Sequence, residues 1–194
     1  MTTALIVVDV QNDFCEGGSL PVTGGTQVAR DIAAFTGRDL AKAGGHGITY
    51  VVATRDRHID PGAHFSDAPD FVDSWPRHCV VGTPGADFHP AVAQLPFHAV
   101  FDKGAYSAAY SGFEGTIGGT ASGESLHHWL NRHGVGKVHV CGLATDHCVR
   151  ATALDASRLG YHTTVLLGLS AAVSSARVPL VIEELQNARV LVTM

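Results

Sequence analysis

The chain has 194 residues, of which 45% are hydrophobic and 16% are charged, and its formal net charge at pH 7 is −5. This length is sufficient for one domain with a sizeable core, so we expect a single domain over residues 1–194. The mildly acidic balance argues against nucleic-acid and anionic-membrane partners, because both are bound through basic patches.

The first half of the chain contains three predicted strands and one helix. The apolar run at 4–10 predicts a strand buried on both faces, and the spacing of Val28, Ile32 and Phe35 then predicts a helix that ends at Gly44-Gly45. Residues 48–54 and 99–101 predict two further strands. The intervening segment, 55–95, shows little periodicity, and its tryptophan, phenylalanine and histidine residues argue for a functional loop over a disordered one.

The second half continues the alternation of helices and strands. A helix at 126–130 precedes a strand at 138–143, a second helix reaches Gly160, and strands at 162–167 and 188–193 enclose a helix at 179–186 with Pro179 in its first turn. Alternation of this kind predicts an α/β fold, a mostly parallel six-stranded sheet with helices on both faces.

No targeting or disulfide pattern is visible. The first apolar run is too short for a signal peptide and no later run could span a bilayer, so we expect a cytoplasmic protein. The cysteines lack the spacing of a disulfide framework, and we expect reduced thiols at Cys15, Cys79, Cys141 and Cys148.

Cys148 follows the strand at 138–143 through a turn at Thr145-Asp146. Both turn residues are natural N-caps, which would place Cys148 in the first turn of a helix. The unpaired amides and the dipole of that helix start predict a thiol that ionises easily and a site for an oxyanion. A buried, inert thiol is an equally acceptable interpretation of this segment alone.

Reactive side chains stand at four predicted strand ends: Asp9, Asp56 with His58, Lys103, and the Cys148 turn. Ligands of open parallel sheets bind beyond the carboxyl ends of the strands. Singly, Asp9 could cap backbone amides and Lys103 could be a solvated charge. Together they favour Asp9 as a general base for Cys148, with Lys103 keeping the carboxylate ionised and favouring the thiolate.

One carboxylate and three imidazoles lie in or next to the long loop: Asp56, His58, His64 and His78. This donor set suits a divalent transition metal such as zinc or iron. Each of these histidines, taken singly, could instead make ordinary hydrogen bonds. Cys79 could replace one of the histidines as a metal ligand.

Two further interpretations concern the neighbourhood of the thiol. Phe14 and Trp75 either pack their loops or form aromatic walls for a flat ring. His147 is adjacent to Cys148, but a catalytic Cys-His pair does not require adjacency, so Asp9 is the better base.

These motifs together resemble the nicotinamidase/pyrazinamidase branch of the isochorismatase-like hydrolases. The similar segments are Val7-Val8-Asp9-Val10-Gln11-Asn12-Asp13-Phe14, Asp56-x-His58-Ile59-Asp60-Pro61-Gly62-x-His64-Phe65, Trp75-Pro76-x-His78-Cys79, Lys103-Gly104, Tyr110-Ser111-Gly112-Phe113 and Ala144-Thr145-Asp146-His147-Cys148-Val149. They cover most of the chain from Ala4 to about Ala156, whereas the segment from Tyr161 onward is similar only in pattern.

The resemblance implies a role for each of these groups. The catalytic triad would be Asp9, Lys103 and Cys148, and the oxyanion hole would be the amides of Ala144 and Cys148, with a cis peptide between Leu143 and Ala144. The metal ligands would be Asp56, His58, His64 and His78, and the substrate ring would lie against Phe14, Trp75 and Tyr110.

The implied activity is metal-dependent hydrolysis of nicotinamide, and of pyrazinamide as a surrogate, to the acid and ammonia through a Cys148 thioester. One divalent ion, zinc, iron or manganese, is the expected cofactor, and a nicotinamide-like small molecule is the expected partner of a monomer or homo-oligomer. Another cysteine amidohydrolase of the family, acting on a carbamoyl or ureido substrate, would keep the triad without the metal cluster. A non-catalytic binding protein or a structural metal domain would also be compatible with these residues.

Overall fold

A seven-stranded sheet forms the middle layer of the protein, with the strand order β4-β3-β2-β1-β5-β6-β7. In this computed structural model, which describes residues 1–41 and 47–194, the strands are β1 (Thr2–Val8), β2 (Ile48–Asp56), β3 (Ala99–Lys103), β4 (Thr116–Ile117), β5 (Val135–Leu143), β6 (His162–Ala171) and β7 (Leu191–Thr193). Neighbouring strands pair in parallel, except that β3 and β4 pair antiparallel. The mostly parallel α/β sheet is confirmed, and the two-residue β4, too short to give a sequence pattern, joins the six predicted strands.

Helices connect the strands and lie on both sides of the sheet: α1 (Gly25–Ala41), α2 (Pro90–Ala93), α3 (Leu126–Arg132), α4 (Arg150–Arg158) and α5 (Val178–Asn187). A π-helical turn, η5 (Thr145–Val149), precedes α4, and shorter 3-10 turns lie in the loops at η1 (Asn12–Phe14), η2 (Gly62–His64), η3 (Pro84–Ala86), η4 (Gly112–Glu114) and η6 (Ser175–Arg177). Pro179 stands in the first turn of α5, as predicted. The end of the first helix predicted at Gly44-Gly45 lies outside the described residues.

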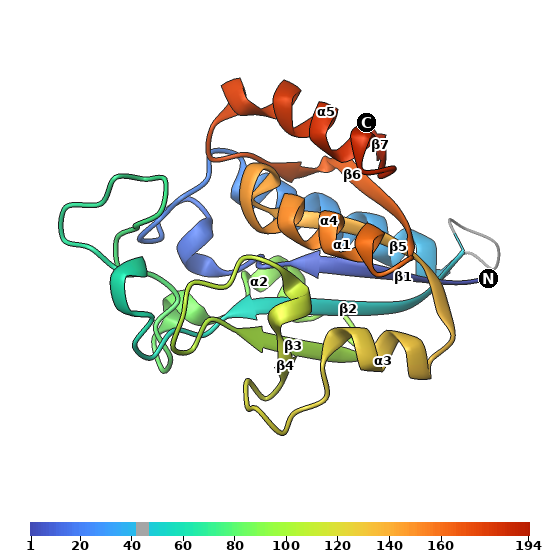
Figure 1. The fold of residues 1–194 in the computed structure, drawn as a ribbon, viewed down its shortest axis with the longest axis horizontal. Helices are drawn as coiled ribbons and strands as arrows, with labels where there is room; N and C mark the ends of the chain where they lie inside the picture. The colour runs from blue at the N-terminus through green and yellow to red at the C-terminus, as the bar shows by residue number, and fades with distance from the viewer. Residues whose placement is uncertain (42–46) are drawn as a thin grey trace.

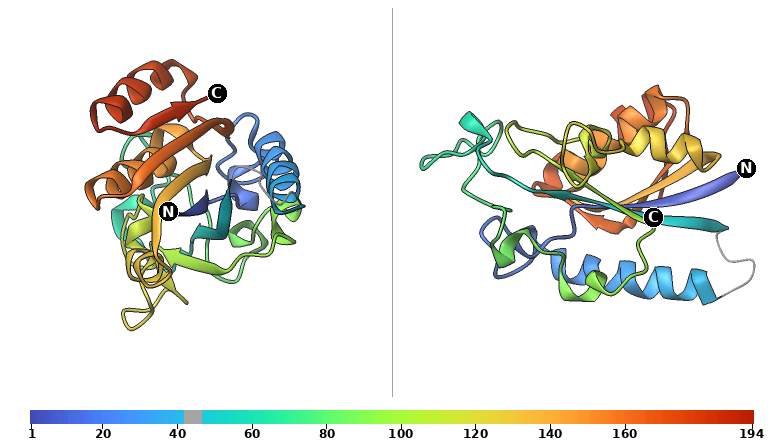
Figure 2. Two further views of the ribbon diagram at one scale, coloured as in Figure 1. Left: turned by 90° about the vertical axis from the view of Figure 1, so that its right-hand side faces the viewer. Right: turned by 90° about the horizontal axis from the view of Figure 1, so that it is seen from below.

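Two apolar layers fix the helices to the sheet. Along β1, the fully buried side chains alternate, with Ala4, Ile6 and Val8 facing one side and Leu5 and Val7 facing the other. Helices α3, α4 and α5 pack on the first side, and α1 and α2 pack on the second (Figures 1 and 2). In the described part of the chain, no helix combines the length and apolar character that a bilayer span requires.

The long connection between β2 and β3 is held by its own contacts. Its backbone forms isolated parallel bridges between Phe65 and Trp75 and between His58 and Val80. One carboxylate oxygen of Asp70 accepts hydrogen bonds from the backbone amides of residues 72–74. These contacts give the segment a defined path although it contains little regular secondary structure.

The strand order reverses between β1 and β5, because β2 and β3 extend the sheet on one side and β5, β6 and β7 on the other. Ligand sites of parallel sheets lie outside the carboxyl ends of the strands at such a switch point. Close approach of the two strands depends on Gly142, whose φ is +118° and whose added Cβ would lie 2.2 Å from the carbonyl oxygen of Val8. The segments that leave β1 and β5 therefore start side by side.

Candidate active site

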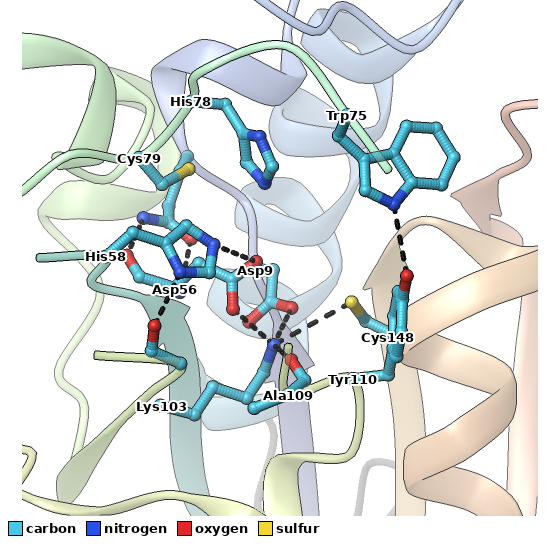
Figure 3. A network of polar contacts seen from close by, with 12 residues as sticks. Asp9, Asp56, His58, Trp75, His78, Cys79, Lys103, Ala109, Tyr110 and Cys148 are labelled. Carbon is cyan, nitrogen blue, oxygen red and sulfur yellow. Dashed lines mark hydrogen bonds and ion pairs between the residues drawn. The ribbon is translucent and has the colours of Figure 1, made fainter. Parts of the chain in front are cut away.

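Side chains from four strand ends meet beyond the carboxyl edge of the sheet (Figure 3). Asp9 directly follows β1, Asp56 and Lys103 are the last residues of β2 and β3, and Cys148 lies in η5 after β5. All four are buried, and one ligand atom each from Asp9, Asp56 and Cys148 lies within 4.8 Å of the others. The predicted convergence of the strand ends is confirmed.

Lys103 is the cation around which this group is arranged. Its Nζ donates hydrogen bonds to Asp56 Oδ1 at 2.6 Å, to the carbonyl oxygen of Ala109 at 2.8 Å and to Cys148 Sγ at 3.7 Å. It also lies 2.9 Å from Asp9 Oδ2. Burial disfavours the charged form, but Asp56, Asp9 and Cys148 outweigh it and raise the pKa of Lys103 well above its usual range. Lys103 is therefore an ammonium shared by two carboxylates and a sulfur.

Asp9 is held in a left-handed backbone conformation, with φ of 50°. Its amide donates to the carbonyl oxygen of Thr54 at 3.2 Å, and the Thr54 hydroxyl donates to Asp9 Oδ1 at 2.6 Å. Complete burial raises the pKa of Asp9, although Lys103 opposes that shift. A carboxylate with a raised pKa both accepts and returns a proton more readily near neutral pH.

The prediction of an easily ionised thiol is wrong. Burial is the main cause that raises the pKa of Cys148 well above that of a free thiol, and the carboxylates of Asp9 and Asp56 add to it while Lys103 opposes it. The helix-start argument considered only the local backbone and left out desolvation and the two neighbouring negative charges. The buried thiol therefore favours its protonated form, and the carboxylates of Asp9 and Asp56 lie next to it.

The turn that carries Cys148 also differs from the predicted N-cap. It is a π-helical turn whose N-cap is Ala144, and the peptide between Leu143 and Ala144 is cis, as the family resemblance implies. Asp146 caps no helix here; its buried carboxylate accepts hydrogen bonds from the amides of Val173 and Ser174, at 2.9 and 3.0 Å. These bonds tie the turn to the segment that follows β6.

The imidazoles of His58, His64 and His78 form a second group, with one ring nitrogen from each within 4.8 Å of the others. His58 Nδ1 donates to the carbonyl oxygen of Gly104 at 2.6 Å, and His78 Nδ1 donates to that of Pro76 at 2.7 Å. Burial lowers the pKa of His78, and burial together with the neighbouring imidazoles lowers the pKa of His64 to about 4. His64 and His78 are therefore neutral at pH 7, the form that binds metals.

This second group fits a metal ion. Among the described residues, the buried atoms His58 Nε2 and His64 Nδ1 have no hydrogen-bond partner, which is costly unless a ligand completes them. Asp56 joins the two groups, because Oδ2 lies 3.8 Å from His58 Nε2 while Oδ1 contacts Lys103. Cys79 belongs to neither group of converging ligand atoms within the described part of the chain.

Gln11 and Thr54 are supporting residues that sequence reasoning missed. Gln11 is fully buried, donates through Nε2 to the carbonyl oxygen of Asp56 at 2.8 Å and accepts from the Asp56 amide at 2.8 Å. A glutamine directly after the apolar run at 4–10 is the sequence signal available for Gln11. A threonine at a strand end is common, so Thr54 gave no signal of its own.

A cavity beside Cys148 is lined by members of both groups and by aromatic side chains. Its wall includes Cys148, Asp56, His64, His78, Ala144, Phe14, Trp75 and Tyr110. Trp75 Nε1 donates to the Tyr110 hydroxyl at 3.0 Å, and the Phe14 ring centroid lies 5.4 Å from that of His78. His147 faces these aromatics, edge-on to Trp75 at 5.0 Å and stacked on Tyr110 at 6.0 Å. The cavity thus brings a thiol, imidazole rings and aromatic side chains together on one wall.

Comparison with known proteins identifies the family of the chain. Residues 3–194 match the isochorismatase domain family. The chain is 55% identical over 187 residues to the nicotinamidase/pyrazinamidase of Mycobacterium tuberculosis, with 96% of each chain covered. It also resembles the solved structure of the pyrazinamidase of Pyrococcus horikoshii in complex with zinc, at 33% identity and a TM-score of 0.80, covering 100% of this chain and 99% of that one. A protein from L. infantum in complex with nicotinate gives 34% identity and a TM-score of 0.82, covering 99% of this chain and 92% of that one.

Proposed function

The chain belongs to the isochorismatase family, and from that premise we propose that it hydrolyses nicotinamide, and pyrazinamide as a surrogate, to the carboxylic acid and ammonia. The observation that carries this proposal is the cavity beside Cys148. Its wall contains the Cys148 thiol, the imidazoles of His64 and His78, and the aromatic side chains of Phe14, Trp75 and Tyr110. The similarity to a nicotinamidase/pyrazinamidase and to a nicotinate complex supports the choice of a heteroaromatic carboxamide.

The first chemical step is attack of Cys148 Sγ on the carboxamide carbon. Asp9 takes the thiol proton as the C–S bond forms, and the electron pair of the carbonyl bond moves onto oxygen. The amides of Ala144 and Cys148 stabilise that negative oxygen. Asp9 then gives the proton to the leaving nitrogen, the C–N bond breaks, and ammonia departs from a thioester.

The second step regenerates the thiol. Asp9 takes a proton from water as the water oxygen attacks the thioester carbon, and it returns this proton to sulfur as the C–S bond breaks. Lys103, hydrogen-bonded to the sulfur, stabilises negative charge on Cys148 whenever it develops.

Asp56, His58, His64 and His78 would hold one divalent transition metal, zinc, iron or manganese. When bound, the ion supplies a positively charged template for a pyridine-type ring nitrogen. Phe14, Trp75 and Tyr110 would hold the ring by its faces and edges, which keeps the carboxamide next to the sulfur.

The test is ammonia release from nicotinamide by purified protein and its variants. We expect Cys148→Ala to lose at least about 10⁴-fold in rate with an unchanged melting temperature. Cys15→Ala removes another buried thiol and should retain activity within about twofold, since it lies outside the reacting group. Chelation should silence the wild-type protein, and zinc, iron or manganese should restore it.

Each competing function predicts a different result. Activity that survives chelation, with carbamoyl or ureido compounds as the better substrates, would support the other amidohydrolases. Unaltered behaviour of Cys148→Ala would indicate a binding protein, and a protein that melts on chelation would indicate a structural metal.

A further inference from the structure

The two oxygens of Asp9 have different surroundings. Oδ1 accepts the Thr54 hydroxyl at 2.6 Å. Oδ2 is buried 2.9 Å from Lys103 Nζ, yet it accepts no hydrogen bond of acceptable geometry from any described residue. One oxygen is therefore occupied, whereas the other has only an ionic contact.

The contacts of Lys103 explain why Oδ2 stays open. An ammonium group has three N–H donors. Those of Lys103 are directed to Asp56 Oδ1, the carbonyl oxygen of Ala109 and Cys148 Sγ. Asp9 Oδ2, 2.9 Å from Nζ, keeps an ionic contact with the ammonium, but it is not among these three hydrogen-bond acceptors. A lone pair of this oxygen is therefore left for the proton of the neighbouring thiol.

Thr54 is well placed to keep the carboxylate in this orientation. It is fully buried on β2, and besides its hydroxyl bond it accepts the Asp9 amide through its carbonyl oxygen at 3.2 Å. Its methyl group is enclosed as well, because a Cβ added to Gly112 would lie 2.8 Å from Thr54 Cγ2. The hydroxyl therefore has little freedom to turn away from Oδ1.

We propose that Thr54 is a positioning residue that reserves Oδ2 of Asp9 as the proton-carrying oxygen of the reaction. Without the hydroxyl, Oδ1 has no fixed donor and the carboxylate can rotate toward Lys103, so that neither oxygen is held facing the sulfur. Proton transfer between Cys148 and Asp9 then becomes slower, while the substrate cavity keeps its shape. This inference rests on the proposed function for its kinetic test, but the reactivity of the thiol tests it independently.

The central experiment compares Thr54→Val, which keeps the shape and removes the hydroxyl, with Thr54→Ser, which keeps the hydroxyl and removes the methyl group. We expect Thr54→Val to lower kcat for nicotinamide by about 10- to 100-fold with KM within about twofold, a part of the 10²- to 10⁴-fold that general-base catalysis supplies. Thr54→Ser should recover to within about threefold of wild type. The matched control is Thr163→Val, which removes a buried hydroxyl bonded to the carbonyl oxygen of Tyr161 and should leave kcat unaltered.

Alkylation by iodoacetamide, followed by mass spectrometry of the Cys148 peptide, needs no substrate. We expect the rate at Cys148 to fall by about tenfold or more in Thr54→Val and to be restored in Thr54→Ser. If wild type released no ammonia, the proposed function would fail while this alkylation series still decided the role of Thr54. Equal alkylation rates in wild type and Thr54→Val, a loss confined to KM, or Thr54→Ser as slow as Thr54→Val would each overturn the proposal. Thr54→Ala serves as the hydroxyl-free variant if Thr54→Val does not fold.

Discussion

The two halves of the site differ in how complete they are. The half around Lys103 pairs its charges internally, since the ammonium contacts Asp9, Asp56 and Cys148, and even Asp9 Oδ2, which accepts no hydrogen bond from a described residue, has an ionic contact with Nζ. The imidazole half leaves buried ring nitrogens without a partner among the described residues. The first half should therefore be needed for folding as well as chemistry, and the second should depend on an external ion for its order.

The strongest challenge to this comparison is Lys103→Met, which removes the cation but keeps much of the volume. Two buried carboxylates would lose their partner, and we expect a loss of about 3–5 kcal/mol in the free energy of unfolding. Activity should fall by about 10²- to 10³-fold or more, since Lys103 also stabilises the sulfur. Urea unfolding and ammonia release measure both effects, with the exposed Lys137→Met as control. Stability equal to wild type would mean that the first half is not internally paired.

His64→Ala tests the other half. It removes one of the three converging donors, and we expect zinc affinity to fall by about 100-fold or more, since loss of even a ligand's supporting contact typically costs 10- to 100-fold. The unfolding free energy of the metal-free protein should change far less than in Lys103→Met. Competition with a chromophoric chelator gives the affinity, and His162→Ala, at an exposed position on β6, is the control. Undiminished zinc affinity would remove His64 from the metal site.

The pH dependence of the metal-free protein sharpens the same contrast. The pKa of His64 is lowered from 6.5 to about 4 by burial, so the unfolded chain binds its proton first as the pH falls. Stability is then present above pH 6.5 and is lost progressively toward pH 4. This single group should cost about 2 kcal/mol between pH 8 and pH 5. Urea unfolding in the presence of a chelator should show a fall in unfolding free energy between pH 8 and pH 5 that is smaller in His64→Ala than in wild type by this amount. The same fall in both proteins would show that His64 does not cause the pH dependence.

The smallest effect is expected at the aromatic wall, which belongs to neither half. Tyr110→Phe removes the acceptor of the Trp75 indole hydrogen bond but keeps the ring. We expect KM for nicotinamide to rise by about three- to tenfold with kcat nearly unchanged, the cost of one hydrogen bond of about 1 kcal/mol. Tyr50→Phe, whose ring packs against Trp129 and does not line the cavity, is the control. A fall in kcat of more than tenfold would give Tyr110 a chemical role.

The sequence predicted the meeting of the strand ends because polar residues there interrupt buried apolar runs. Asp9 interrupts the run at 4–10, Lys103 follows Asp102 at the end of the short run at 99–101, and strand alternation alone brings them to one edge. The imidazoles were predicted as a set because their residue types share one chemistry, although their spacing in the long loop does not determine their distances.

What the sequence could not predict depends on contacts between distant segments. Thr54 is an ordinary strand residue until Asp9 lies beside it, and the raised pKa of Cys148 follows from total burial near two carboxylates. Thr145-Asp146 predicts an N-cap but also fits the π-helical turn, and the hydrogen-bond partners of Asp146 that distinguish the two lie beyond β6.

The position of β1 in the middle of the sheet has a consequence for how the chain assembles. Within this sheet β1 comes first along the chain, yet it pairs on one side with β5, where Cys141 lies opposite Val7. Pairings between such distant segments close long loops and slow folding. Until β5 has emerged, this largely apolar strand retains an unpaired edge, and in this interval the nascent chain should be most prone to aggregation and most dependent on chaperones.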